Sequence, residues 1–209
     1  MLPAPKNSCR NPNRPPRLHA RIWLPIFALF LFIASCGEER LDDYNDLSVE
    51  LTNQYGEAVT FPDDLKGKPV LMGFIYTHCP DICSFITANL HSVWEELDET
   101  DEAHFVLVTF DPERDRPEIL HNYAEAFDMN RSPFTFLTGD PDQVEALMKR
   151  LGVRSQVSYT TETEEGEELY FLNHTDKILL IDENGRLVMD YGGSMTPTGI
   201  FTTDLNELL

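Results

Sequence analysis

One uncharged apolar segment, residues 69–76, constrains the fold of this chain more than any other feature. It reads Pro-Val-Leu-Met-Gly-Phe-Ile-Tyr, and an unbroken run of this length is typical of a strand buried on both faces. Apolar residues at helical spacing begin a few positions later, at Ile82, Phe85, Ile86, Leu90, Val93, Trp94 and Leu97. A buried strand that leads into an amphipathic helix indicates an α/β domain.

Strands and helices alternate along the rest of the chain. The sequence predicts strands at 47–52, 58–61, 104–110, 134–137, 177–181 and 186–191, and helices at 116–127, 142–151 and 197–208. The first helix is expected to begin near Pro80, and residues 63–68 are expected to form a loop. Residues 155–173 read as an inserted hairpin with an acidic tip at 161–168. This order predicts an α/β fold in which helices flank a central mixed sheet, with an N-terminal hairpin and an inserted hairpin.

The first 35 residues predict a secretory signal. Residues 1–21 hold five basic side chains and no acidic one, and residues 22–34 form an apolar run that only Pro25 interrupts. The run is shorter than the roughly 20 residues that a membrane-spanning helix needs. It ends in Ile-Ala-Ser-Cys at 33–36, which resembles a bacterial lipoprotein processing site, so we expect cleavage before Cys36 and lipidation of its thiol. An uncleaved anchor helix is the alternative, and both place the domain outside the cytoplasm, attached to a membrane.

The predicted parts are therefore a signal peptide at 1–35, a lipidated Cys36 with a polar linker at 36–46, and a folded domain at 47–209. Removal of residues 1–35 takes five of the 16 basic side chains and none of the 36 acidic ones, which changes the net charge from −20 to −25. Such an acidic domain argues against nucleic acid as a partner. Anionic lipid surfaces also repel it, so the anchor must supply the membrane affinity.

Only Cys79 and Cys83 of the four cysteines lie in the predicted mature domain. A helix that begins near Pro80 places Cys79 at its N-terminus and Cys83 one turn later on the same face. The free N–H groups and the dipole of that helix end favour thiolates, which are both nucleophiles and soft metal ligands. A structural disulfide is a weaker alternative, because a bridge across three residues removes little entropy from the unfolded chain.

Four motifs in series resemble the Sco/SenC family of copper proteins. They are Tyr-Thr-His-Cys-Pro-Asp-Ile-Cys at 76–83, Leu-Lys-Gly-Lys-Pro-Val at 65–70, Asp-Pro-Glu-Arg-Asp at 111–115 and Asn-His-Thr at 173–175. The resemblance covers about residues 46–209 and implies a thioredoxin-like fold that binds one copper ion per chain. The implied ligands are Cys79, Cys83 and His174. Asp111 resembles a position near the family's metal site, where it would orient a ligand, and a loop cap formed by Asp111 and Asp115 is the alternative.

The chemistry of these residues agrees with the resemblance. Two thiolates satisfy Cu(I), and an imidazole adds a ligand that suits Cu(II), although zinc accepts the same ligands. The other histidines considered, His78, His91 and His121, are expected to face away from the site or to pack, and Tyr76 and Phe110 to pack around it. Departures from the family pattern occur at Ser84, Thr109, Phe110 and Asn173, and none of them removes an implied ligand.

Family members help assemble the dinuclear copper site of cytochrome c oxidase by delivering copper, by reducing cysteines of that site, or by both. The implied partners are the copper-bearing oxidase subunit and a thiol reductant or copper donor. The alternative function is a thiol–disulfide oxidoreductase that uses Cys79 and Cys83 without metal, so the sequence leaves open whether the chain is an enzyme. A thiol peroxidase is disfavoured, because Tyr76 stands where such enzymes usually carry threonine.

Overall fold

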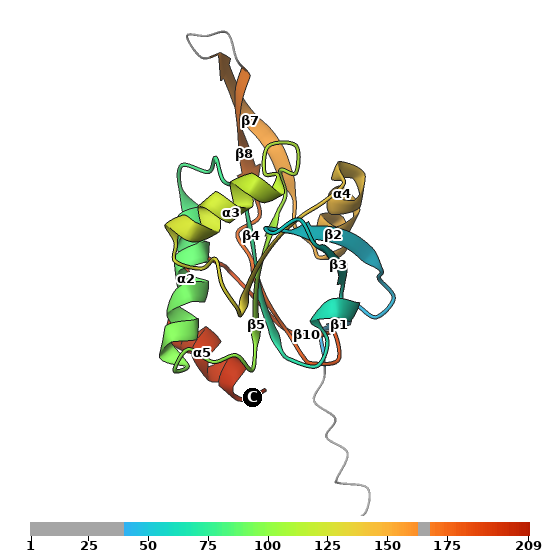
Figure 1. Cartoon of the computed structure of the whole chain (residues 1–209), viewed down its shortest axis with the longest axis vertical. Coiled ribbons are helices and arrows are strands. Elements are labelled where there is room, and N and C mark those ends of the chain that lie inside the picture. The colour runs from blue at the N-terminus through green and yellow to red at the C-terminus, as the bar shows by residue number, and fades with distance from the viewer. Residues whose placement is uncertain (1–39, 163–167) are drawn as a thin grey trace, which may run out of the picture. The chain divides into compact units, whose positions relative to one another are not determined.

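An eight-stranded mixed sheet forms the centre of the fold (Figure 1). The computed structural model describes residues 40–162 and 168–209. The predicted signal peptide and Cys36 lie outside these ranges. Within them, no helix combines the length and the apolar character that crossing a bilayer requires. The strand order in the sheet is β1-β10-β9-β4-β5-β6-β2-β3, and β7 and β8 form a separate two-stranded sheet.

Most predicted elements are present within a few residues of their expected ends. The strands are β1 (Asp42–Asp43), β2 (Val49–Asn53), β3 (Ala58–Phe61), β4 (Val70–Ile75), β5 (His104–Thr109), β6 (Phe134–Thr138), β7 (Ser155–Glu162), β8 (Glu168–His174), β9 (Ile178–Ile181) and β10 (Arg186–Tyr191). The helices are α2 (Ile82–Glu96), α3 (Pro117–Ala126), α4 (Pro141–Arg150) and α5 (Thr198–Asn206). The predicted mixed sheet with flanking helices and two hairpins is confirmed.

Strand β4 lies in the middle of the sheet and carries the site at its end. It pairs in parallel with β5 and antiparallel with β9, and all six of its residues are buried, as the apolar run predicts. Helix α2 packs on β4 and β5. Gly73 permits this close approach, because a Cβ atom at that position would lie 2.7 Å from Cγ2 of Ile86. The strand and the helix therefore hold the cysteine segment between two rigid elements.

The start of α2 differs from the prediction. The helix begins at Ile82, so Pro80 and Cys79 lie in the preceding loop. Within this loop the N–H of Cys79 donates to the carbonyl of Tyr76 (3.2 Å), and the N–H of Thr77 donates to the carboxylate of Asp115 (3.0 Å). These bonds hold the chain in turns after β4 and delay the helix by two residues. The expected loop at 63–68 also contains a short 3-10 helix, η1 (Asp63–Leu65).

The predicted linker at 36–46 is wrong for its last residues. Strand β1 pairs with β10, and the ring of Tyr44 is buried, with 1% of its surface exposed. The guanidinium of Arg150 binds the carboxylate of Asp42 through Nη1 (2.5 Å) and Nη2 (3.1 Å). This segment therefore belongs to the folded domain. The sequence shows no local sign of this, because the partners of the segment on β10 and α4 come from the distant C-terminal half of the chain.

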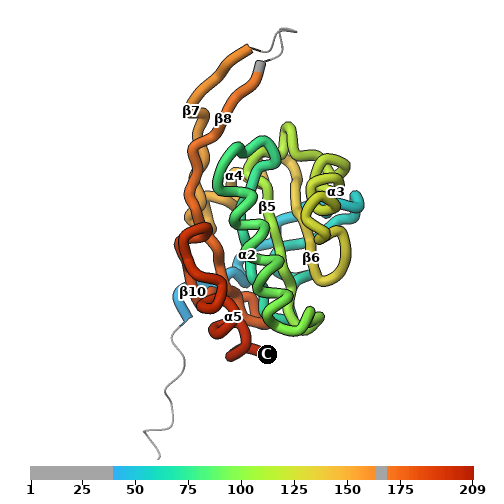
Figure 2. Tube along the Cα trace, turned by 90° about the vertical axis from the view of Figure 1, so that its left-hand side faces the viewer, coloured from blue at the N-terminus to red at the C-terminus, as the bar shows by residue number. Residues whose placement is uncertain are grey.

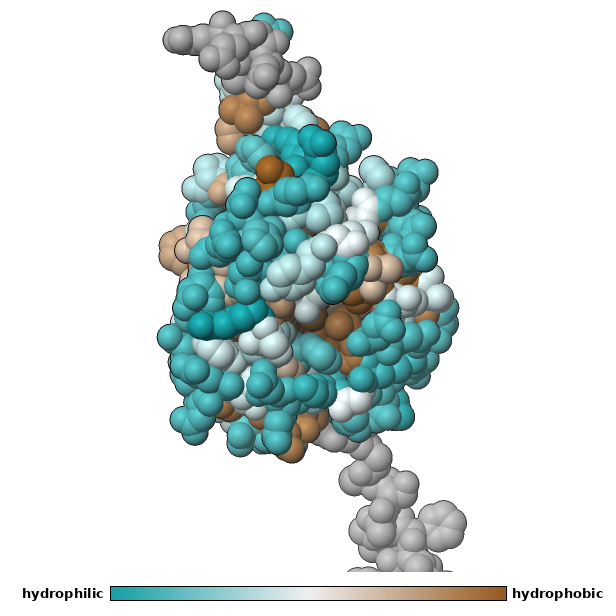
Figure 3. All heavy atoms as spheres, in the orientation of Figure 1, coloured by the Kyte–Doolittle hydropathy of each residue, from teal (hydrophilic) through white to brown (hydrophobic). Residues whose placement is uncertain are grey.

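The hairpin β7–β8 extends beyond the main body of the described fold (Figures 1 and 2). Seven of the eight residues of β7 are exposed. Much of the predicted acidic tip, residues 163–167, lies outside the described residues. The face of the molecule in Figure 3 is largely hydrophilic, in keeping with the excess of acidic side chains. The end of β8 returns to the main body and brings its last residue, His174, close to the end of β4.

Candidate metal centre

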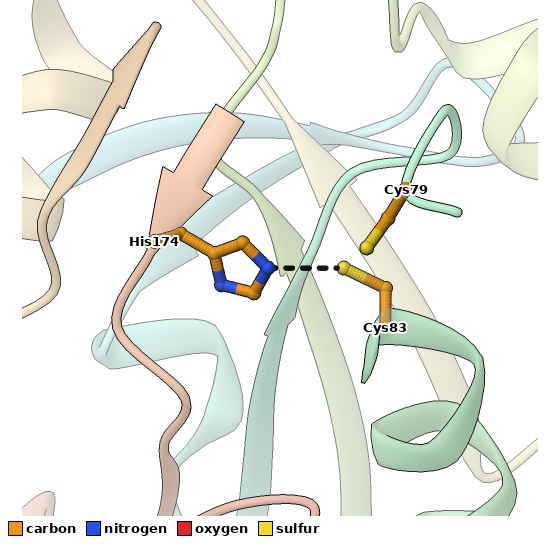
Figure 4. A group of neighbouring side chains, drawn as sticks. All are labelled: Cys79, Cys83 and His174. Carbon is orange, nitrogen blue, oxygen red and sulfur yellow. Dashed lines mark hydrogen bonds between the residues drawn. The ribbon is translucent and has the colours of Figure 1, made fainter. Parts of the chain in front are cut away.

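Two cysteines that are four residues apart and a histidine from a distant part of the sequence meet at the end of β4 (Figure 4). Cys79 comes from the loop after β4, Cys83 from the first turn of α2, and His174 from the end of β8. One potential ligand atom from each residue, two sulfurs and a ring nitrogen, lies within 4.8 Å of the others. Within 40–162 and 168–209 this is the one group of three or more potential ligand side chains close enough to hold a metal ion.

The two cysteines are free thiols in different environments. Cys83 is buried, with 1% of its surface exposed, whereas Cys79 is half-buried and reachable from solvent. A hydrogen bond from the Cys83 thiol lowers the pKa of Cys79 to about 4, against the opposing effect of burial, with further donors in His174 and the backbone N–H groups of Cys83 and Asp81. The same hydrogen bond, together with burial, raises the pKa of Cys83. At neutral pH these shifts favour a thiolate at Cys79 and a protonated thiol at Cys83.

The lowered pKa of Cys79 favours a thiolate, as the sequence predicts for the start of the helix, but its main cause is different. The hydrogen bond from Cys83 is the largest effect, and backbone N–H groups of the loop and first turn add to it. Because the helix begins at Ile82, Cys83 is the helical residue of the pair and Cys79 faces it from the loop.

His174 is oriented by its own backbone neighbourhood. Its Nδ1 lies 3.0 Å from the carbonyl oxygen of Thr175, and because a carbonyl only accepts, Nδ1 donates the proton. Nε2 then points at the sulfur of Cys83, 3.6 Å away. Burial alone would lower the pKa of His174, but hydrogen bonds with Cys79 and Thr175 and the thiolate charge raise it overall. The orientation leaves Nε2 as the nitrogen that faces the two sulfurs.

Two aromatic rings enclose the imidazole, as expected for Tyr76 and Phe110. The Phe110 ring centroid lies 4.5 Å from that of His174, and the Tyr76 ring meets His174 edge-on at 5.9 Å. Tyr76 is 1% exposed and Phe110 is also buried. These rings restrict the orientation of His174 and shield one side of the site from water.

The motif at 111–115 affects the site indirectly, by holding the loop that carries Cys79. Asp115 is fully buried and accepts hydrogen bonds from Thr77, through N–H (3.0 Å) and Oγ1 (2.5 Å), and from Oγ1 of Thr109 (2.6 Å). Burial raises the pKa of Asp115, and the bonds from Thr109 and Thr77 oppose this effect. The loop cap that the sequence suggested for Asp111 and Asp115 is thus found at Asp115, which holds the cysteine loop through Thr77.

Among the residues that the structure describes, the carboxylate of Asp111 pairs with Arg114 and Tyr170 and not with the three candidate ligands. Its carboxylate accepts from Nε of Arg114 (2.5 Å) and from the hydroxyl of Tyr170 (2.8 Å). Asp111 therefore reaches the site indirectly, through the hairpin that carries His174 and through Asp115, whose N–H donates to the Asp111 carbonyl (2.9 Å). No sequence signal pointed to Tyr170, because this contact joins residues 59 positions apart.

The other histidines lie apart from the group of three. His78 is exposed and its Nδ1 contacts the hydroxyl of Thr77 (3.1 Å). His91 stacks on Phe134, with ring centroids 5.9 Å apart, and His121 lies beside Glu125. His174 is thus the histidine that the fold brings to the cysteine pair, although the sequence singled it out only by family resemblance.

The arrangement has two chemical capacities. Thiolates and imidazole together suit copper and zinc, and soft thiolates favour Cu(I). A stabilised thiolate beside a protonated thiol also suits thiol–disulfide exchange. Fold and site together define an α/β protein in which a dithiol after the central strand and an imidazole from an inserted hairpin form a group able to hold a metal ion.

Comparison with known proteins assigns the family. The SCO1/SenC family model matches residues 40–209. The chain belongs to the SCO1/SenC family, as the four motifs indicated. The matched range includes residues 40–46, in agreement with the finding that these residues are part of the folded domain.

Relatives and solved structures agree with this assignment. The SCO1 protein homolog of Bacillus subtilis (strain 168) is 28% identical over 169 residues, which cover 79% of this chain and 84% of the relative. A structure of Bradyrhizobium japonicum ScoI with copper bound has 32% identity and a TM-score of 0.61, and covers 78% of this chain and 98% of that one. A SCO1/SenC family lipoprotein from Bacillus anthracis str. Ames has 28% identity and a TM-score of 0.65, with 81% and 97% covered. The predicted thioredoxin-like fold is confirmed.

Proposed function

We propose that this chain is a copper-binding metallochaperone, tethered to a membrane outside the cytoplasm, that helps assemble the dinuclear copper site of cytochrome c oxidase. The observation that carries the proposal is the convergence of Cys79, Cys83 and His174, whose ligand atoms lie within 4.8 Å of one another. Membership of the Sco family, a family of cytochrome c oxidase assembly proteins, supports the biological role.

Copper is favoured as the metal by the ligand types and by the relatives. Two sulfurs and one imidazole nitrogen serve both Cu(I) and Cu(II), whereas oxygen-preferring ions such as Mg²⁺ and Ca²⁺ would find no carboxylate in this group. A relative 32% identical to this chain has been solved with copper bound. We assign one copper ion per chain to these three residues.

Each ligand has a distinct part in this proposal. Cys79 supplies a thiolate at neutral pH, because its pKa is lowered to about 4. Cys83 must release a proton when a metal binds, since its pKa is raised in the copper-free protein. His174 presents Nε2, because the carbonyl of Thr175 holds the Nδ1 proton. The solvent-accessible position of Cys79 supports transfer of the ion to a partner.

The membrane tether is proposed from the sequence of residues 1–36. The basic segment, the apolar run and Cys36 form a lipoprotein-type signal. The relative from Bacillus anthracis str. Ames is described as a lipoprotein, which supports this assignment. A lipid on Cys36 would hold the acidic domain near membrane-bound partners despite electrostatic repulsion from anionic headgroups.

Copper titration of purified, reduced protein tests the ligand set. We expect one copper per chain, loss of Cu(I) binding in Cys79→Ser and Cys83→Ser, and a sharp loss of Cu(II) affinity in His174→Ala. His78→Ala is the matched control, because His78 adjoins Cys79 but is exposed and outside the group. Unchanged Cu(II) binding in His174→Ala, or an equal loss in His78→Ala, would contradict the assignment.

A second candidate function, thiol–disulfide exchange, is favoured by the asymmetry of the two thiols. The accessible Cys79 thiolate is suited to attack a partner disulfide, and the protonated, buried Cys83 is suited to resolve the mixed disulfide. In that reaction the partner gains two thiols and this chain gains a Cys79–Cys83 disulfide. Oxidase assembly in cells separates the functions: the exchange reaction requires both cysteines but tolerates His174→Ala, whereas copper delivery requires all three residues.

A further inference from the structure

The strand that carries His174 shares no strand pairing with the main sheet within the described residues. It pairs only with β7, and an isolated two-stranded ribbon is marginally stable in water. The position of His174 relative to the cysteines therefore depends on contacts between the base of the hairpin and the body. These contacts are specific and come from residues that the ligand set does not include.

One face of β8 meets the body through alternate residues. Tyr170, Leu172 and His174 share a face, because side chains alternate along a strand. The hydroxyl of Tyr170 donates to Oδ1 of Asp111 (2.8 Å), and the side chain of Leu172 packs against the core. The N–H of Leu172 also donates to the hydroxyl oxygen of Tyr76 (3.2 Å). The strand is thus attached at two successive positions on this face before it reaches His174.

Arg114 strengthens the first of these attachments. Its Nε donates to Oδ2 of Asp111 (2.5 Å) and its Nη1 donates to the backbone carbonyl of Tyr170 (2.9 Å). The guanidinium carbon lies 3.5 Å from the centroid of the Tyr170 ring. Asp111 is buried, so its bonds to Arg114 and Tyr170 form in a region of low dielectric and resist competition from water. Asp111 and Arg114 therefore hold Tyr170 by its hydroxyl, its ring and its backbone.

We propose that Tyr170, Asp111 and Arg114 form a clamp that positions His174 as the nitrogen ligand of the metal. The clamp residues touch no ligand atom; they fix the strand about 13 Å before His174, at four residues of strand rise. This inference rests on the proposed function, since it concerns how the third ligand is held. Cu(II) depends on the imidazole more than Cu(I) does, because two thiolates already satisfy Cu(I). Loss of the clamp therefore affects Cu(II) binding selectively.

The variant Tyr170→Phe tests the clamp with a minimal change. It removes one hydroxyl, while the ring can still stack on Arg114 and the Asp111–Arg114 pair is retained. The matched control is Tyr159→Phe, which removes a hydroxyl from the same hairpin at a position that is 61% exposed. We expect Tyr170→Phe to weaken Cu(II) binding about tenfold, as outer partners of metal ligands commonly do, with an altered nitrogen signature in the electron paramagnetic resonance spectrum. Cu(I) affinity should change less than about threefold, and Tyr159→Phe should behave as the unmodified chain.

A copper-free measurement checks the same contact. Amide hydrogen exchange of the peptide 169–174 should be faster in Tyr170→Phe than in the unmodified protein and unchanged in Tyr159→Phe. Arg114→Lys is a second variant that keeps a cation beside Asp111. It loses the planar guanidinium, which donates to both Asp111 and the Tyr170 carbonyl and stacks on the Tyr170 ring. It should reproduce the selective loss of Cu(II) affinity.

The outcomes separate this inference from the proposed function. If the unmodified chain binds copper through His174 but Tyr170→Phe retains its Cu(II) affinity and spectrum, the clamp is overturned and the function stands. A lower melting temperature in Tyr170→Phe with an unchanged Cu(II) spectrum also overturns it, because that result shows a merely structural contact. If the unmodified chain does not bind copper through His174, the ligand set fails and the clamp with it.

Discussion

The thiol of Cys83 controls the ionisation of Cys79, and this prediction can be tested without metal. The hydrogen bond from Cys83 is the largest cause of the low pKa of Cys79, about 4. A hydrogen bond to a charged group contributes about 1.5–3 kcal/mol. Since one pKa unit corresponds to about 1.36 kcal/mol, Cys83→Ala should raise the pKa of Cys79 by about one to two units. Cys83→Ser keeps a hydroxyl donor and should raise it less.

The assay is the rate of alkylation of Cys79 by iodoacetamide as a function of pH, in copper-free protein. Only the thiolate reacts, so the rate rises with pH through the pKa and then reaches a plateau. In the unmodified chain Cys83 is buried, and mass spectrometry of the peptide confirms which thiol is labelled. The midpoint should lie near 4 in the unmodified chain and move upward in Cys83→Ala. An unmodified midpoint near the ordinary value of about 8.5, or no movement in Cys83→Ala, would refute the reasoning.

Three further predictions concern the scaffold, each measured by urea denaturation. Gly73→Ala should destabilise the fold by about 1–3 kcal/mol, because the new Cβ would lie 2.7 Å from Cγ2 of Ile86. The control Gly199→Ala should not destabilise it, because there is open space around that position. Equal effects of the two variants would contradict the packing argument. Tyr44→Ala should cost about 3–5 kcal/mol because the ring is buried, and a change below about 0.5 kcal/mol would restore the linker interpretation. Asp115→Asn should cost about 1–3 kcal/mol, since it replaces one of two acceptor oxygens by an NH2 donor that faces the donors of Thr77 and Thr109. An unchanged midpoint would dismiss this anchor.

The sequence predicted the elements that carry strong local patterns. The uncharged run at 69–76 identified β4. The strands predicted at 177–181 and 186–191 correspond to β9 and β10, which Asp-Glu-Asn-Gly at 182–185, a typical tight-turn sequence, joins into a hairpin. In both cases the signal is local. Burial on two faces requires a short run of apolar residues, and a tight turn requires particular residues within the turn itself. Cys79 and Cys83 were singled out for the same reason, since their spacing is visible within five residues.

The differences arise where distant residues decide local structure. The start of α2 at Ile82 reflects hydrogen bonds from the preceding loop to Asp115, 38 residues beyond Thr77. The ring of Tyr44 packs against Phe61 and the guanidinium of Arg150, and β1 pairs with β10, so residues 40–46 fold through distant partners and carry no periodic signal of their own. His174 has no local feature that marks it as a ligand. Family resemblance predicted it, and the fold places it beside the sulfurs.

The most direct test of the account is X-ray absorption spectroscopy of the full chain, loaded with one equivalent of Cu(I) or Cu(II) in detergent. The account predicts two sulfur neighbours at copper in both oxidation states, with one imidazole nitrogen that is lost in His174→Ala. Spectra that contain no sulfur neighbour, or that retain the imidazole signal in His174→Ala, would contradict it.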